Sequence, residues 1–187
     1  STAVTNGNFA AALAGWTDRS EAGASTLGTA GLASFVGTGV NAAILDQQVT
    51  VVAADLGVEH ALRIVVTRGP ILLRVGASLG TDEYISETEL ATGDHSLTLH
   101  PVGDFHIRFL SRLKRQVLID QCTIEPAGDM ELPTTWAAGD LDFIRYDQSG
   151  DVIFCACQGQ QQRRIERRSS DSWSIVINAE ISFAPSG

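Results

Sequence analysis

An acidic segment near the middle of the chain carries the side chains best suited to binding a sugar. Tyr84 lies within GTDEYISETEL, and Asp82, Glu83 and Glu87 surround it in sequence. An exposed aromatic ring can stack on a sugar face, and carboxylates can accept hydrogen bonds from sugar hydroxyls. These residues therefore form a candidate glycan-binding site. The alternative interpretation is a loop whose tyrosine and charges face water.

The residue types that carry enzymatic chemistry lack the necessary spacing. The sequence contains no phosphate-binding glycine loop and no H-E-x-x-H. Paired carboxylates that hydrolyse glycosides need an environment that raises one pKa, and the segment around Glu87 and Glu89 has no apolar pocket residues beside it. We therefore expect a protein that is not an enzyme.

Histidine and cysteine give no metal-binding pattern. His95 and His100 are five residues apart, so on one strand their side chains would point to opposite faces. Three cysteines are present, Cys122, Cys155 and Cys157, and C-x-C alone cannot supply the four ligands of a zinc site. We expect buried, reduced thiols, with a disulfide between Cys122 and one of the other two as the alternative.

The charge balance argues against nucleic acid as a partner. The 13 basic and 22 acidic residues give a net charge of −9, which repels phosphate backbones. The arginines of RRIERR, at 163–168, are expected to pair with acidic residues of the chain itself. No apolar run approaches the ~20 residues of a membrane span. The chain also has no initiator Met or signal-like start, so we expect a processed product or a piece of a longer protein.

The stretch DFHIRFLSRLKRQVLIDQCTIE, at 104–125, predicts two strands around one basic turn. Phe105, Ile107 and Phe109 share a face on the first arm, as in a half-buried strand. On the second arm the apolar residues change phase after position 119. One inserted residue restores the phase, so we expect a β-bulge near Asp120 and Gln121.

The other apolar runs of the first 125 residues are also short and strand-like. We expect a first strand that ends at Phe9, a second that begins near Trp16, and a hairpin turn at Gly69 and Pro70. Four further strands are predicted at Ala43–Val51, Ala61–Thr67, Ile71–Val75 and His95–His100. Turn residues recur at the spacing of an all-β sandwich.

The pattern changes after residue 125. A linker begins at Pro126 and leads to a short helix over 137–143, which Thr134 or Thr135 could cap. Three strands are predicted at Val152–Cys157, Arg163–Arg168 and Ser172–Ile177. The sequence thus predicts a β-sandwich over 1–127 and a small β module with one short helix over 128–187.

The first part resembles the galactose-binding-like jelly roll of carbohydrate-binding modules. The resemblance rests on NGNF and LAGW near the start, AAILDQQVTV at 42–51 and VLIDQCTIE at 117–125. It implies that the opening and closing strands are neighbours, that Trp16 is a core residue, and that Asp120 could hold a structural calcium ion through hard oxygen ligands. Ala10 stands where such modules have an acidic ligand. An Asp that accepts backbone hydrogen bonds at a bulge is therefore the alternative, and otherwise no cofactor is expected.

The second part, Leu132–Val176, resembles a small β module of tail and other virion proteins of tailed bacteriophages and prophages. The motifs are Asp140-Leu141, QSGD before an apolar strand, the arginine-rich strand and SWSIV. Relatives carry prolines before the arginine strand, where this chain has glutamines at 160–162. The resemblance implies location in a virion.

Together these features predict a non-enzymatic virion component, a tail or spike protein. Its jelly roll would attach to host-surface polysaccharide or pack against other virion proteins, and copies would form a homo-oligomer within the particle. A pure assembly module without glycan binding is the alternative. An accessory domain of a cell-wall glycan hydrolase is the third.

Overall fold

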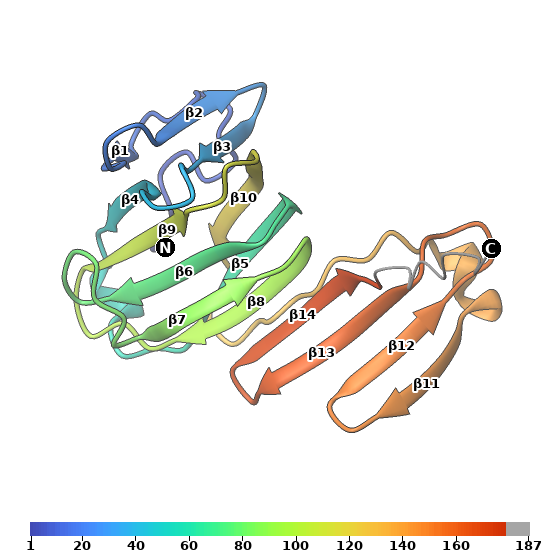
Figure 1. Ribbon diagram of the computed structural model, residues 1–187. Helices are drawn as coiled ribbons and strands as arrows, with labels where there is room; N and C mark the ends of the chain where they lie inside the picture. Colours follow the sequence, from blue (N-terminus) through green and yellow to red (C-terminus); the bar gives the residue numbers. More distant parts are fainter. Residues whose placement is uncertain (179–187) are drawn as a thin grey trace, which may run out of the picture.

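The chain folds into a β-sandwich with a four-stranded extension (Figure 1). The computed structural model describes residues 1–178 of the 187-residue chain. The C-terminal end of the predicted 128–187 unit therefore lies outside the described residues. Two short 3-10 helices, η1 (Ala53–Asp55) and η2 (Ala138–Phe143), are the helical elements within 1–178.

Ten strands form the sandwich, and their order is that of a jelly roll. They are β1 (Thr17–Asp18), β2 (Ser25–Thr29), β3 (Leu32–Val36), β4 (Ala43–Val49), β5 (His60–Arg68), β6 (Ile71–Gly76), β7 (Ile85–Leu90), β8 (Gly93–Leu99), β9 (Phe105–Ser111) and β10 (Val117–Ile124). One sheet has the order β1-β4-β9-β6-β7, and the facing sheet contains β8-β5-β10-β3-β2. From β3 to β10 each strand lies in the sheet opposite the strand before it, except that β6 and β7 are neighbours in one sheet. Such crossings between two sheets are typical of a jelly roll. The predicted all-β sandwich is confirmed.

The apolar core lies between these two sheets. Phe105, Ile107 and Phe109 of β9 are fully buried, as their alternation predicts. The Trp16 ring lies 5.9 Å from the Phe109 ring and 5.4 Å from Phe9, centroid to centroid. Trp16 is therefore a core residue, as expected.

Two predicted hairpins are wrong, because the strands on either side of each turn belong to different sheets. β9 pairs with β4 and β6, whereas β10 pairs with β3 and β5. The Gly69-Pro70 turn likewise connects β5 in one sheet to β6 in the other. Hydrophobic alternation identifies the face of a strand that meets the core, but both sheets of a sandwich face the same core. The pattern therefore cannot distinguish a hairpin from a crossing between sheets.

The predicted bulge is confirmed. Ile119 pairs with Val66 and Gln121 pairs with Val65, so Asp120 is the extra residue without a partner on β5. The shift returns Cys122 to the core, where it is fully buried.

Two features of the first 90 residues differ from the prediction. Phe9 ends no strand: it sits in a series of turns with φ 51° and anchors them in the core. Only the second half of the acidic segment forms β7, while Asp82, Glu83 and Tyr84 lie in the connection before it. Ile85 and Leu90 of this strand both face the core although they are five residues apart, because the β6–β7 register shifts between Leu73 and Val75. That shift hides the period of two on which strand prediction depends.

The extension consists of four antiparallel strands that follow η2. They are β11 (Arg145–Ser149), β12 (Val152–Ala156), β13 (Arg163–Ser169) and β14 (Ser172–Ile177). β11 was not anticipated, because its sequence RYDQS is polar and exposed. The predicted threonine cap of the helix is wrong, since Asp140 instead accepts a hydrogen bond from the backbone N–H of Ala137 at 2.8 Å.

The extension is attached to the sandwich through backbone pairing. β14 lies antiparallel to β8, with Ser172 opposite Leu97 and Val176 opposite Gly93. The two parts thus share a nine-stranded sheet, β11-β12-β13-β14-β8-β5-β10-β3-β2, which Figure 1 shows running from the sandwich to the far end of the extension. The backbone approach at Gly93 is close, because a Cβ there would lie 2.4 Å from the carbonyl oxygen of Ile175.

Candidate functional site

One face of the extension has a depression whose lining is suited to ligand binding. Its volume is about 480 Å³, and apolar and polar side chains both contribute to it. The lining residues are Gln148, Asp151, Ile153, Ile165, Arg167, Ser170 and Trp173. We call it the Trp173 depression.

Trp173 and Arg167 are opposite one another on β14 and β13. The guanidinium carbon of Arg167 lies 5.8 Å from the centroid of the Trp173 ring, a cation–π distance. The indole N–H donates a hydrogen bond to the carbonyl oxygen of Ser170 at 3.2 Å, which fixes the orientation of the ring. Asp151 lies 3.6 Å from Arg167 and completes an ion pair at the rim.

A tight turn brings the polar rim to the apolar floor. Gly150, with φ 58°, and Asp151 form the two-residue connection between β11 and β12. Beyond the turn, Ile153 pairs directly with Ile165 and supplies the floor. The backbone N–H of Arg167 donates to the carbonyl oxygen of Asp151 at 2.9 Å, so the turn is held against β13.

The depression has an aromatic ring beside Arg167, Gln148 and Asp151; Gln148 donates to the carbonyl oxygen of Gly150 at 3.0 Å, and Arg167 pairs with Asp151. Such a mixture suits a ligand with apolar faces and hydroxyl groups, as a sugar has. Sequence reasoning assigned Trp173 to the framework of the small module and did not consider it for binding. The sequence feature that could have indicated this site is the short distance along the chain between Arg167 and Trp173, which a hairpin places opposite each other.

The predicted site around Tyr84 has a different geometry from the one expected. The Tyr84 ring is half-buried and packs edge-on against Phe105, with 6.2 Å between centroids. Its hydroxyl accepts a hydrogen bond from the backbone N–H of Val102 at 3.3 Å. The ring thus contributes to the edge of the core and is no exposed plate.

The acidic residues near Tyr84 make hydrogen bonds and ion pairs within the chain. Glu83 accepts hydrogen bonds from the Thr81 hydroxyl and from a backbone N–H, and the Thr81 bond lowers the pKa of this carboxyl. Asp82 accepts from the backbone N–H of Glu87 at 3.0 Å. Glu87 in turn binds the guanidinium of Arg74 at 2.8 Å. Glycan contact through this group remains a prediction, and its carboxylates are already engaged.

Asp120 is exposed at the bulge of β10. Within residues 1–178, no group of three or more His, Cys, Asp or Glu side chains is placed to hold a metal ion. The opening loop does lie beside this strand, since the backbone N–H of Cys122 donates to the carbonyl oxygen of Gly7 at 2.7 Å. Calcium at Asp120 remains a prediction, with hydrogen bonding at the bulge as its alternative.

A buried ion-pair network lies on the outer side of the five-stranded sheet. Asp46 is 2% exposed and receives two hydrogen bonds from the Arg108 guanidinium, at 2.7 and 2.8 Å. Arg19 approaches the same carboxylate at 3.1 Å. The hydrogen bonds to Asp46 raise the pKa of Arg108. This network was not predicted, because its members are distant along the chain. It ties β9 and the residue after β1 to β4.

The cysteines and histidines take structural positions. Cys122, Cys155 and Cys157 are free and buried, which confirms the prediction of reduced thiols. Burial raises the pKa of Cys122. His95 is buried at the β8–β14 boundary, where its Nε2 lies 2.8 Å from the carbonyl oxygen of Ala91, and burial lowers its pKa to about 4.

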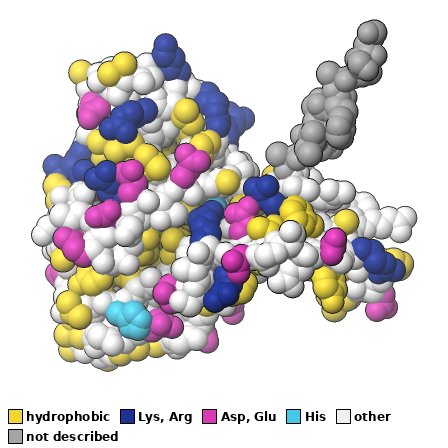
Figure 2. All heavy atoms as spheres, turned by 60° about the horizontal axis from the view of Figure 1, so that its bottom comes forward, with side chains coloured by type: hydrophobic (Ala, Val, Ile, Leu, Met, Phe, Trp, Pro, Cys, Tyr) yellow, Lys and Arg dark blue, Asp and Glu magenta, His cyan; other side chains and the backbone are white. Residues whose placement is uncertain are grey.

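The arginines of β13 mostly pair with acidic residues, as expected. Arg164 lies 2.8 Å and Arg168 3.8 Å from Glu166. Figure 2 shows basic and acidic side chains interspersed over the visible face, with apolar ones reaching the surface of the extension. No described helix has the length and hydropathy of a bilayer-crossing segment.

Comparison with known proteins gives a similarity to solved structures only. No protein-family model and no curated protein matches the chain. A solved structure described as "CBM4 structure and function" matches with 13% sequence identity and a TM-score of 0.43, covering 66% of this chain and 99% of the other.

Proposed function

We propose that the protein is a non-enzymatic structural component of a phage-like particle, a tail or spike part. The observation that carries the proposal is the backbone pairing of β14 with β8, which makes the sandwich and the extension one continuous sheet. A rigid sheet of this length suits a part that spaces and presents surfaces to neighbours. The resemblance of the Leu132–Val176 sequence to a virion module is the support for the proposed location.

The test is whether the protein sediments with particles. Particles from an induced culture of the source organism would be banded on a density gradient and probed by immunoblot and mass spectrometry. We expect the protein in the particle band at a fixed ratio to the major structural proteins. Recovery only from the unbanded fraction would contradict the proposal.

The Trp173 depression supports a second function, attachment to host-surface polysaccharide. Its aromatic ring, apolar floor and polar rim occur together in one hollow of about 480 Å³. Trp173 is half-buried like Tyr84, but its ring lines this hollow beside an arginine and an apolar floor, whereas the Tyr84 ring packs against Phe105. An assembly role without glycan binding remains the alternative, with the same sheet geometry in support.

A glycan array, followed by calorimetry on any hit, separates these functions. We expect Trp173→Ala to abolish measurable binding, because the stacking surface is lost. The matched control is Phe154→Ala, which removes another exposed aromatic ring of the extension outside the depression. Glu87→Gln tests the predicted acidic segment. Absence of any hit, or equal loss in Phe154→Ala, would leave assembly without glycan binding.

A further inference from the structure

Strand β11 is the open edge of the nine-stranded sheet within the described residues. All five of its residues are exposed. Large apolar side chains are exposed on the strand and on the preceding η2, with Tyr146 76%, Leu141 63% and Phe143 56% exposed. Exposed edge strands are templates for pairing with another strand. This one has no proline, and its two charged residues, Arg145 and Asp147, restrict which strand can pair with it.

The hairpin geometry determines which backbone groups face outward. In a hairpin with a two-residue connection, the flanking pair, here Ser149 and Val152, exchanges hydrogen bonds, and alternate residues then point away from the partner strand. Tyr146 and Gln148 therefore direct their N–H and C=O groups to the open edge. The N–H of Gln148 is already bonded to the Asp147 carboxylate at 2.9 Å. Tyr146 is left with both of its backbone groups available.

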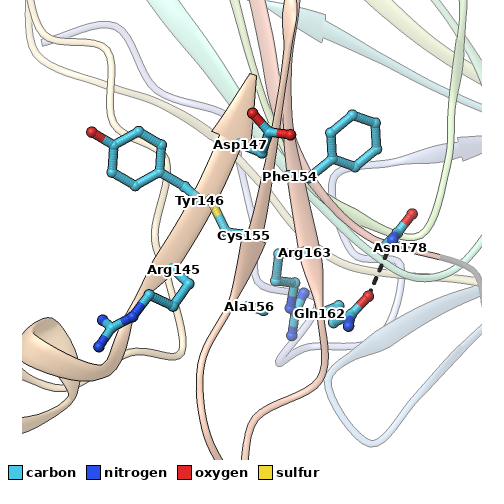
Figure 3. Close-up of a pocket in the computed structure, with 9 residues that line it drawn as sticks. All are labelled: Arg145, Tyr146, Asp147, Phe154, Cys155, Ala156, Gln162, Arg163 and Asn178. Atoms are coloured by element: carbon cyan, nitrogen blue, oxygen red, sulfur yellow. Dashed lines mark hydrogen bonds between the residues drawn. The ribbon is translucent and has the colours of Figure 1, made fainter. Parts of the chain in front are cut away.

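The side chains select a partner strand. In a two-fold antiparallel pairing centred on Tyr146, the two Tyr146 residues are opposite each other, and Arg145 of each copy is opposite Asp147 of the other. Directly opposite charges stabilise a strand pair, as do paired aromatic rings. Centring the pair on Asp147 instead would set two carboxylates against each other. Figure 3 shows Arg145 and Tyr146 projecting from β11 on the side away from β12 and β13.

From this complementarity we infer that β11 pairs with β11 of a second copy of the chain, in the register centred on Tyr146. The contact is isologous and closed, since each copy presents the same patch once. Two nine-stranded sheets thereby join into one. The exposed apolar residues of η2, Leu141 and Phe143, then lie beside the partner's hairpin. The inference stands independently of a virion location and of glycan binding.

Sedimentation velocity on the full 187-residue chain, over a concentration series, tests the inference. We expect a reversible monomer–dimer equilibrium. Tyr146→Pro removes the outward N–H without removing a bond to β12, so dimers should disappear while the circular dichroism of the monomer is retained. A chain that is monomeric throughout the series overturns the inference.

Charge reversal tests the register. Arg145→Asp and Asp147→Arg should each weaken the dimer about tenfold, because two attractive pairs become repulsive. The double variant should restore wild-type affinity. Lys114→Asp, on the sandwich, makes the same change in net charge as Arg145→Asp and should have no effect. A double variant that fails to dimerise, or single variants that dimerise normally, would contradict the pairing.

Discussion

The sandwich and the extension are both antiparallel β-structure, but they are stabilised differently. In the sandwich, two sheets enclose a continuous core in which Phe35, Phe105 and Phe109 are fully buried. In the extension, one sheet has surfaces on both sides, and Tyr146 and Phe154 are exposed. A sheet without a second layer gains its stability from its neighbours along the strand edge. The extension therefore depends on β8 in a way that the sandwich does not depend on β14.

The largest effect is expected for a core residue of the sandwich. Phe109 contacts Trp16 and Phe35, with ring centroids 5.9 and 6.4 Å away. Phe109→Ala should lower the free energy of unfolding by about 3–5 kcal/mol through lost burial and a cavity. Urea denaturation followed by tryptophan fluorescence measures this. A loss no larger than that of an exposed aromatic would contradict the described core.

A smaller but more selective loss is expected at the boundary between the two parts. Gly93 has φ 147°, and a Cβ there would lie 2.4 Å from the backbone oxygen of Ile175. Gly93→Ala should cost about 2–3 kcal/mol in strain and separate β14 from β8. Limited proteolysis should then cut within 126–178 while the sandwich stays intact. Unchanged resistance to protease would contradict the pairing of β14 with β8 at Gly93.

Acidification should weaken the same boundary. The pKa of His95 falls from 6.5 unfolded to about 4 folded, because burial disfavours its charged form. The folded state binds fewer protons, so this contribution is complete above pH 6.5 and is lost as the pH falls toward 4. In His95→Gln the melting temperature should fall less between pH 6.5 and 4 than it does in wild type. The difference corresponds to roughly 1–3 kcal/mol in the free energy of unfolding. His100→Gln, at an exposed position, is the matched control, and identical slopes in both variants would contradict the assignment.

The smallest effect is expected on the open face of the extension. Phe154 is 40% exposed, and its side chain lies outside both apolar clusters of the described core. Phe154→Ala should change the free energy of unfolding by no more than about 1 kcal/mol. The same urea series measures it beside Phe109→Ala. A loss near that of Phe109→Ala would mean that the extension has a core of its own.

The sequence predicted the elements whose physical signal is local. The β9 alternation and the bulge at Asp120 were predicted correctly, because each depends on residues close together in the chain. The buried Trp16 was implied by the resemblance to a jelly roll, not by a local pattern. Strand partners were not, since β9 and β10 face one core from opposite sheets. The polar strand β11 carries no hydrophobic pattern at all.

The candidate site shows the same limit. The aromatic residue in the acidic segment, Tyr84, was the obvious choice in sequence, yet it packs against Phe105 at the core edge. Trp173 is a candidate for ligand binding because Arg167 of the neighbouring strand lies over its ring and Asp151, on a separate turn, pairs with that arginine. Those contacts follow from register, which composition and spacing leave undetermined.

The central claim is that β14 and β8 are neighbours in one sheet, and amide hydrogen exchange tests it most directly. We expect the amides of Gly93–Leu99 and Ser172–Ile177 to be protected together and to exchange at a common rate slower than that of β11. Exchange of β8 at the rate of an open edge strand, with β14 exchanging separately from it, would contradict the continuous sheet.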